Sequence, residues 1–238
     1  MFNISKRNNN NNNNNNKTNL DDFVIETPVE NHEVKDISKQ LYEKGITPSD
    51  DYLAIIVDNF LSKEECEHLI KVTEATGYNE ALVNIGGGAQ MSMKDFRNSD
   101  RCMIDDERVA SVFYEKSQQY IPESLFRENQ TWTKTGINER LRFLRYQKGG
   151  YFRPHCDGSY TRPDGHEQSF VTFFLFLNDS CTGGSSTFVS LVNSDNFPCE
   201  PVPGRLIIFQ HDIFHEGSFV EGGLKYALRS DYMYKRKI

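Results

Sequence analysis

The sequence has few cysteines, and no two of them form a motif. The five cysteines are scattered, and none stands in a Cys-x-x-Cys pair. An odd, dispersed set is typical of free thiols in a reducing compartment, and it does not support a zinc site with cysteine ligands. The sequence also lacks any stretch close to the roughly 20 apolar residues of a membrane span. We therefore expect no membrane partner.

A long run of basic residues is also missing, and the formal net charge is −7. Because nucleic-acid binding requires a basic surface, we expect no nucleic-acid partner. Residues 1–17 contain no apolar core, so no secretory signal is visible. Together with the dispersed cysteines, this predicts a cytoplasmic or nuclear protein.

The composition divides the chain into three parts. Residues 1–22 form an Asn-rich tail, in which Asn8–Asn16 is an unbroken asparagine tract. Such a tract buries nothing that would offset its ordering entropy, so we expect this tail to be disordered. Residues 23–51 are polar and predict a linker with one short helix near residues 34–44. Residues 52–238 are enough for one domain of moderate size.

The folded part begins with helical patterning. Ser62 and Glu65 form a capping box ahead of a predicted helix, which Gly77 ends. A second helix is expected from about Asp105. The segment between the two helices, residues 85–101, is rich in glycine and predicts a mobile loop that is able to close over a bound chain.

From Arg140 onward the pattern changes to short strands, separated by turns that contain Gly, Asn or Pro. The apolar run Phe170–Leu177 contains one polar residue, Thr172, as expected of a strand that is buried on both faces. No helical pattern interrupts this succession of strands. We therefore predict a mainly β fold with supporting helices, in the form of a double-stranded β-helix, or jelly roll.

The most informative motif is the tripeptide His155-Cys156-Asp157, which His215 follows sixty residues after the first histidine. Residues two apart on a strand share a face, so His155 and Asp157 converge if this segment is extended. A histidine from a neighbouring strand then completes two nitrogens and one oxygen on one side of a metal. That arrangement is typical of non-haem Fe(II) oxygenases, because the other side stays open for a co-substrate and O₂. His211 is the alternative distal ligand, but it falls in a predicted turn, and strand alternation favours His215.

The last strong strand predicts an anion site beside this metal. Alternation places Lys225 and Arg229 on the same face, and a cation inside a small barrel is costly unless it meets an anion. Either side chain fits a co-substrate carboxylate, and Arg229 has the bidentate geometry for one. Tyr146 and Thr172 are further candidates for binding the same anion, and each also fits a purely structural role.

The stretch from Leu141 to Gly158 resembles the metal-binding segment of Fe(II)/2-oxoglutarate-dependent dioxygenases, in particular the prolyl 4-hydroxylase-like branch. The resemblance covers about residues 52–238. Further matches follow in order, namely Thr172, Leu177-Asn178-Asp179, Gly183-Gly184 with Phe188, Pro203-Gly204-Arg205 through Phe209, and His215 with Lys225.

The resemblance implies a role for each candidate residue. The expected iron ligands are His155, Asp157 and His215. The expected ligands of 2-oxoglutarate are Lys225 at the distal carboxylate, with Tyr146 and Thr172 assisting. Phe176 stands where some protein-prolyl hydroxylases carry a Tyr, and Arg229 is an additional cation, so Arg229 remains the reserve anchor. The implied cofactors are Fe(II), 2-oxoglutarate as co-substrate, O₂, and ascorbate as reductant.

The resemblance also implies a reaction, which is hydroxylation of a C–H bond of a prolyl residue with release of succinate and CO₂. The expected partner is therefore a protein or peptide substrate. Two alternatives remain for the folded domain, namely the same chemistry on a small molecule and a jelly-roll module that binds metal without catalysis. A third alternative is an interaction protein that acts through its Asn-rich tail. Formation of succinate from 2-oxoglutarate distinguishes an enzyme from both non-catalytic alternatives.

Overall fold

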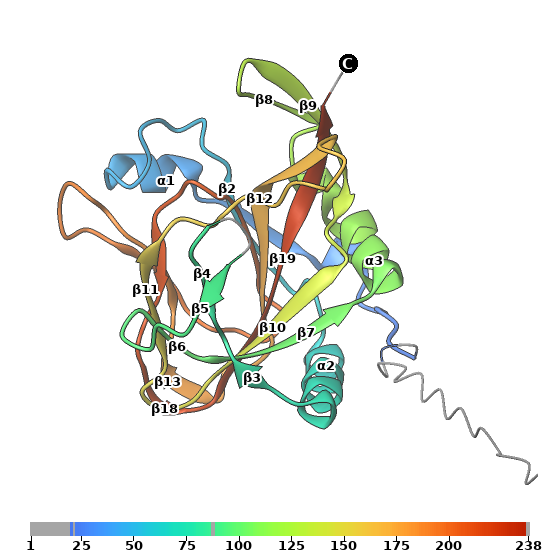
Figure 1. The fold of residues 1–238 in the computed structure, drawn as a ribbon, viewed down its shortest axis with the longest axis vertical. Helices are drawn as coiled ribbons and strands as arrows, with labels where there is room; N and C mark the ends of the chain where they lie inside the picture. Colours follow the sequence, from blue (N-terminus) through green and yellow to red (C-terminus); the bar gives the residue numbers. More distant parts are fainter. Residues whose placement is uncertain (1–19, 21, 87–88, 237–238) are drawn as a thin grey trace, which may run out of the picture.

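A computed structural model of the chain describes residue 20, residues 22–86 and residues 89–236. The predicted disorder of the Asn tract falls outside these residues. Two antiparallel sheets form the centre of the described chain, and two longer helices lie on the outer side of the larger sheet (Figure 1). This arrangement confirms the predicted double-stranded β-helix with supporting helices.

The larger sheet has ten strands and runs in the order β1-β2-β16-β12-β19-β10-β7-β3, while β9 pairs with both β19 and β8. Neighbouring strands come from distant parts of the sequence, so the sheet brings separate motifs side by side. The bounds of its strands are β1 Glu33–Asp36, β2 Ala54–Asp58, β3 Asn79–Glu80, β7 Asp100–Asp105, β8 Ser124–Arg127, β9 Gln130–Ile137, β10 Arg140–Tyr146, β12 Glu167–Phe176, β16 Leu206–Gln210 and β19 Lys225–Arg236.

The smaller sheet has five strands in the order β15-β14-β17-β11-β6. Within it β11 pairs with β17, and His155 stands directly opposite His215. Two ribbons of two strands each complete the β structure. The bounds are β6 Arg97–Asn98, β11 Tyr151–His155, β14 Ser186–Phe188, β15 Phe197–Cys199 and β17 His215–Gly217 in the sheet, and β4 Val83–Asn84 with β5 Gln90–Met91 and β13 Cys181–Gly183 with β18 Val220–Gly223 in the ribbons.

The helices begin and end where the local sequence signals place them. The Ser62 hydroxyl accepts a hydrogen bond from the backbone N–H of Glu65, whose carboxylate accepts one from the backbone N–H of Ser62, so the predicted capping box is confirmed. Gly77 follows the same helix with a φ of 96°, a conformation that suits glycine. The helical bounds are α1 Ser38–Glu43, α2 Lys63–Thr76 and α3 Glu107–Ser117, with 3₁₀ turns η1 Val29–Asn31 and η2 Gln118–Tyr120.

Alternating side chains of the central strands build two cores on opposite faces of the larger sheet. On β12, Phe173 and Leu175 pack into the outer core beneath α2 and α3. Phe174 and Phe176 of the same strand pack into the inner core between the two sheets. Every residue from Ser169 to Phe176 is buried, which confirms the prediction of a strand buried on both faces.

Residues 23–51 belong to the fold, so the prediction of a polar linker over these residues was wrong. Phe23 is 3% exposed, and Ile37 and Leu41 are completely buried. The strand β1 pairs with β2 along its whole length. The apolar residues of this segment are few and carry no periodic signal. Several of them nevertheless pack into a core, namely Phe23, Ile25, Ile37 and Leu41.

The segment from residue 85 to residue 101, predicted as a mobile loop, contains short paired strands among its described residues. It supplies β5 to a ribbon, β6 to the smaller sheet and the start of β7 to the larger sheet. The strands β8 and β9 were also not predicted. The described residues of this segment therefore pair with both sheets and with one ribbon.

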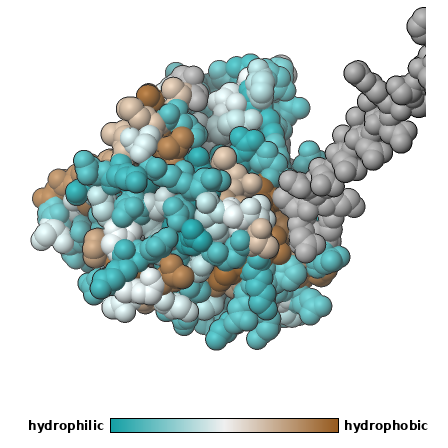
Figure 2. Space-filling view, turned by 60° about the horizontal axis from the view of Figure 1, so that its bottom comes forward, coloured by the Kyte–Doolittle hydropathy of each residue, from teal (hydrophilic) through white to brown (hydrophobic). Residues whose placement is uncertain are grey.

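On the face that Figure 2 shows, apolar side chains form small, separate patches. Figure 2 shows one face, which is largely hydrophilic. None of the helices in the described ranges is both long enough and apolar enough to span a bilayer.

Candidate active site

His155, Asp157 and His215 meet between the two sheets, at the end of β11 and the start of β17. Their potential ligand atoms all lie within 4.8 Å of one another. The Nε2 atom of His155 is 3.8 Å from Oδ1 of Asp157, and the Nε2 atom of His215 is 3.8 Å from Oδ2. Both separations are shorter than twice the length of a metal–ligand bond, which is about 2.0–2.2 Å, so one ion can contact all three side chains.

Backbone carbonyl groups orient both imidazole rings. Nδ1 of His155 donates a hydrogen bond to the carbonyl oxygen of Arg153 at 2.7 Å, and Nδ1 of His215 donates to that of Ile213 at 2.9 Å. A carbonyl oxygen only accepts, so each Nδ1 carries the proton and each Nε2 keeps a lone pair. This is the orientation that histidine ligands require, and the donor set therefore fits a divalent metal.

Burial and charge keep these groups in the protonation states that a metal needs. Burial, followed by the neighbouring His215, lowers the pKa of His155 to about 3, so this ring is neutral at physiological pH. Burial raises the pKa of Asp157, but Arg229 and the surrounding histidines outweigh it, and the net shift is downward. An ionised carboxylate thus stands beside a neutral imidazole, as metal binding requires.

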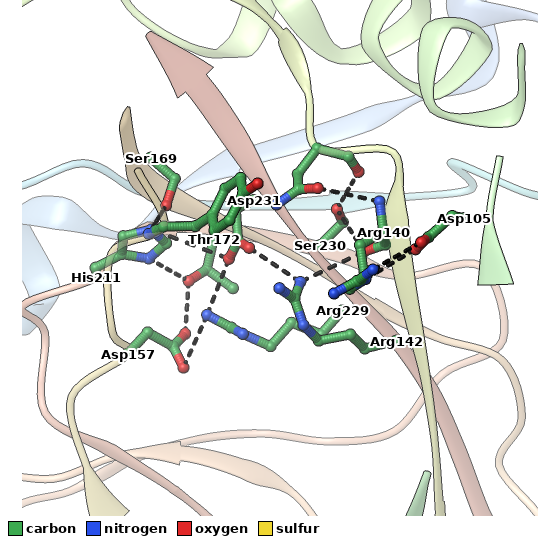
Figure 3. Close-up of polar contacts among 12 residues, drawn as sticks. Asp105, Arg140, Arg142, Asp157, Ser169, Thr172, His211, Arg229, Ser230 and Asp231 are labelled. Atoms are coloured by element: carbon green, nitrogen blue, oxygen red, sulfur yellow. Dashed lines mark hydrogen bonds and ion pairs between the residues drawn. The ribbon is translucent and has the colours of Figure 1, made fainter. Parts of the chain in front are cut away.

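A chain of polar groups holds the Asp157 carboxylate (Figure 3). The Thr172 hydroxyl donates to Oδ2 at 2.6 Å, and Nη2 of Arg229 forms an ion pair with Oδ1 at 3.1 Å. Because Thr172 uses its proton on Asp157, it must accept from Nδ1 of His211, which is 2.9 Å away. Nε2 of His211 then accepts from the hydroxyl of Ser169 at 3.0 Å. Both carboxylate oxygens are therefore fixed by the protein.

This network gives Thr172 a position that differs from the sequence expectation, while His211 lies in a turn as predicted. His211 lies 5% exposed behind the carboxylate and supports it through Thr172. The Thr172 side chain, predicted to help bind 2-oxoglutarate, is fully buried and is not part of the cavity wall. The sequence signal for this network was present in Ser169 and Thr172, since both are polar residues on a strand that is otherwise apolar.

A cavity of about 550 Å³ opens in front of the triad, and Lys225, Tyr146 and Phe174 line it. Tyr146 and Lys225 stand opposite each other in the pairing of β10 with β19, so their side chains share the inner face. Nζ of Lys225 lies 5.1 Å from the centre of the Tyr146 ring. Gly184 leaves room for the lysine stem, because a Cβ at this glycine would lie 3.3 Å from Cδ of Lys225.

Lys225 is an uncompensated cation in this cavity. It is 1% exposed, and no acidic group among the described residues lies within 4.0 Å of its Nζ. Burial lowers the pKa of this amine to about 8. Arg229 is in the opposite situation, because Asp157 at 3.1 Å and Asp231 at 2.9 Å already compensate its charge. The structure thus leaves Lys225, rather than Arg229, available for an incoming anion.

A larger depression of about 1200 Å³ lies between the segment of residues 22–33 and the start of α2. In the part of the chain that the structure describes, the cluster of three metal-ligating side chains lies in the smaller cavity. The smaller cavity is therefore the candidate active site, although it is not the largest depression.

The profile of the 2OG-Fe(II) oxygenase superfamily matches residues 141–230, which include the triad and Lys225. This part of the chain is therefore similar to the 2OG-Fe(II) oxygenase superfamily. Members of that superfamily use Fe(II) and 2-oxoglutarate, together with O₂. The donor set around His155 fits such a metal, and the cavity beside Lys225 fits such an anion.

The proteins that are similar to this chain in sequence include prolyl 4-hydroxylases. Prolyl 4-hydroxylase 5 of Arabidopsis thaliana is 26% identical over 139 residues, which is 57% of this chain and 44% of the relative. Probable prolyl 4-hydroxylase 8 of the same plant is 27% identical over 146 residues, with the same coverage. The chain thus spans less than half the length of these relatives.

Solved structures share the fold of this chain. A prolyl hydroxylase of Trichoplax adhaerens, in complex with a peptide fragment of the hypoxia inducible factor oxygen degradation domain, has a TM-score of 0.58 at 17% identity and covers 82% of this chain and 86% of its own. A Pseudomonas putida prolyl-4-hydroxylase has a TM-score of 0.54 at 17% identity, with coverages of 85% and 98%. These similarities confirm the jelly-roll fold.

Proposed function

We propose that the chain is an Fe(II)- and 2-oxoglutarate-dependent dioxygenase that hydroxylates a prolyl residue in a protein or peptide. The strongest support is that one cavity contains both the three side chains oriented for metal binding and the uncompensated Lys225. The overall reaction consumes a C–H bond, O₂ and 2-oxoglutarate. One oxygen atom enters the new hydroxyl group and the other enters succinate, while the 1-carboxylate leaves as CO₂.

Three side chains of this chain would hold the metal, namely His155, Asp157 and His215. Bound iron would supply the redox chemistry with O₂ that protein side chains lack. The protein supplies orientation, because backbone carbonyls direct both Nε2 lone pairs inward, and Thr172 with Arg229 holds the carboxylate. The three donors lie on one side, so the other side of the site faces the cavity.

Lys225 would bind the distal carboxylate of 2-oxoglutarate. A charge-assisted hydrogen bond in this buried place contributes about 1.5–3 kcal/mol, and it relieves the cost of an unpaired ammonium group. Tyr146 would assist from the neighbouring strand, since its ring lies beside Nζ of the lysine. Phe174 and Phe176 line the other side of that ammonium group, at 5.7 and 5.1 Å, and keep water away from the ion pair.

The prolyl substrate is proposed from the relatives, all of which are named as prolyl 4-hydroxylases. A peptide lies on the related fold in the Trichoplax adhaerens complex, which supports a peptide substrate here. Ascorbate is proposed as the reductant that keeps the iron ferrous. The cysteines described in the structure are free thiols, which supports the proposal of a cytoplasmic or nuclear location.

Mass spectrometry of peptide libraries treated with the chain, Fe(II), 2-oxoglutarate and ascorbate tests this function. We expect a gain of about 16 Da, the mass of one oxygen atom, on proline-containing peptides. The gain should disappear in His155→Ala and persist in His166→Ala, a matched control at an exposed histidine. Oxidation of a free metabolite, with no oxidised peptide, would refute the prolyl assignment.

A further inference from the structure

Two arginines on the wall of the active-site cavity have no role in the mechanism described above. Arg97 belongs to β6 and Arg101 to β7, and both side chains line the cavity that contains the triad. The guanidinium of Arg97 lies 4.6 Å from the centre of the Phe152 ring, which in turn stacks on His155 at 3.6 Å. Arg97 is therefore separated from the metal site by a single aromatic ring.

Strand pairing places Arg101 on the same inner face. In the pairing of β7 with β10, Arg101 stands opposite Leu144, and residues opposite each other share a face. Leu144 itself lines the cavity. Nη2 of Arg101 donates a hydrogen bond to Oε1 of Gln90 at 3.1 Å, which holds the guanidinium against β5 at the edge of the cavity. The two arginines thus flank the site from the side of β6 and β7.

The cavity carries more positive than negative charge. Five basic side chains line it against three acidic ones, which leaves a surplus of two positive charges. An Fe(II) ion and a doubly ionised 2-oxoglutarate cancel each other, so binding both leaves this surplus unchanged. The basic side chains are Arg97, Arg101, Arg142, Lys225 and Arg229, and the acidic ones are Asp157, Glu216 and Asp231.

Once the ion pairs are assigned and 2-oxoglutarate is placed on Lys225, Arg97 and Arg101 are the basic side chains that are left without an anion. Arg142 and Arg229 share Asp231, at 3.0 and 2.9 Å. By contrast, Arg97 donates to the neutral hydroxyl of Ser99 at 2.9 Å. Within the described ranges, no acidic group lies within 4.0 Å of a guanidinium nitrogen of Arg97 or Arg101.

The electrostatics of both arginines agree with a missing anion. Burial, followed by repulsion from Arg97 and three further arginines, lowers the pKa of Arg101 to about 10. Burial also lowers the pKa of Arg97. Partly buried guanidinium groups without a counter-ion are unfavourable, and a planar carboxylate is the anion that their fork of N–H donors fits best.

We propose that Arg97 and Arg101 form a substrate subsite for a carboxylate, which an acidic residue near the oxidised proline supplies. This proposal rests on the proposed function for the prolyl residue. The subsite lies beside the metal rather than on it, so the acid belongs to a neighbouring residue. An extended peptide advances about 3.3–3.6 Å per residue. The path from Arg97 across the Phe152 ring to His155 therefore has the length of about one to three peptide residues.

Position-scanned peptides test the subsite. Each peptide carries one proline, and each neighbouring position in turn carries Asp or the isosteric Asn. For the wild-type chain, we expect Asp at one position to raise kcat/KM for proline oxidation by about 10–100-fold over Asn. In the double variant Arg97→Gln/Arg101→Gln this preference should fall to about twofold or less, and in Arg97→Lys/Arg101→Lys part of it should return.

A control and a second readout separate the subsite from folding and from the proposed function. Arg236→Gln removes the same charge from an exposed arginine at the end of β19, which is not part of the cavity wall, and should keep the full preference for Asp. Thermal unfolding shows whether each variant is folded. Fluorescence anisotropy of the labelled Asp and Asn peptides measures binding without turnover.

The outcomes are distinct. Oxidation of prolines with no preference for Asp, or a preference that survives in the double glutamine variant, would overturn the subsite and leave the proposed function intact. Tighter binding of the Asp peptides that requires both arginines would support the subsite even if no proline were oxidised. Equal binding of Asp and Asn peptides would overturn it. Competition by N-acetylaspartate as strong as that of the peptide would overturn the peptide source and indicate a small acid as the ligand.

Discussion

The hydroxyl group of Thr172 donates a hydrogen bond of 2.6 Å to Oδ2 of Asp157. This contact joins a strand of the larger sheet to the proposed metal ligand that follows β11 in the smaller sheet. His211 lies behind Thr172 and gives the hydroxyl its direction, since Nδ1 of His211 donates and Asp157 accepts. The bond therefore makes Thr172 a positioning residue for the carboxylate.

Replacement of Thr172 by the isosteric Val should weaken metal binding. The change removes one bond to the carboxylate and leaves Nδ1 of His211 unpaired, and loss of such supporting contacts typically lowers metal affinity about 10–100-fold. Anaerobic calorimetric titration with Fe(II) measures this. At saturating metal, the KM for 2-oxoglutarate should stay unchanged. A raised KM with normal metal affinity would instead support the sequence-based expectation that Thr172 binds the co-substrate.

Replacement of Lys225 by Met should raise the KM for 2-oxoglutarate by roughly one to two decades, because a charge-assisted bond contributes about 1.5–3 kcal/mol. Lys235→Met removes a lysine from the exposed end of the same strand and should leave the KM unchanged. If Arg229→Met raised the KM and Lys225→Met did not, Arg229 would be the anchor.

Binding of 2-oxoglutarate should depend on pH through Lys225. Burial lowers the pKa of the free amine to about 8, so the amine loses its proton as the pH rises through that value. A bound carboxylate favours the ammonium form and raises the pKa in the complex. The dissociation constant should therefore be flat below pH 8 and increase by up to about tenfold per pH unit above it, until the pKa of the complex is reached. Anaerobic titrations across this range should show the increase in the wild type and a flat profile in Lys225→Met.

The packing of the N-terminal segment predicts a loss of stability in Phe23→Ala. Phe23 is 3% exposed, and its ring meets that of Phe113 on α3 with a centroid separation of 6.3 Å. Truncation of a buried phenylalanine typically costs about 3–5 kcal/mol of unfolding free energy. Phe126→Ala, at a side chain that is 67% exposed, is the matched control. Equal urea midpoints for the two variants would show that this segment contributes little to the fold.

The sequence predicted well wherever a pattern was periodic or a motif was local. The strands from Arg140 onward alternate or run apolar, and the spacing of His155 and Asp157 is the one that strand geometry predicts, although β11 itself ends at His155. The strand β1 was missed because all four of its side chains are exposed, and backbone pairing with β2 holds it instead. The polar composition of this segment is therefore the reason that the sequence predicted a linker.

The role of Thr172 could not be predicted from the sequence, for a different reason. Its buried position on an apolar strand predicted a polar partner but did not identify one. The partner depends on where the turn with His211 and the end of β11 come to lie, and both belong to other parts of the chain. Whether Lys225 or Arg229 is free to bind the co-substrate likewise depends on the fold. Asp157 and Asp231 form ion pairs with Arg229 and compensate its charge.

Succinate formation from 2-oxoglutarate tests the central claim most directly. The purified wild-type chain should produce succinate when Fe(II) is added and none when the metal is chelated. Asp157→Ala should keep its far-UV circular dichroism and lose succinate formation, while His166→Ala should retain it. Full activity in folded Asp157→Ala, or succinate formation that is independent of Fe(II), would contradict the assignment of this site as an iron- and 2-oxoglutarate-dependent active centre.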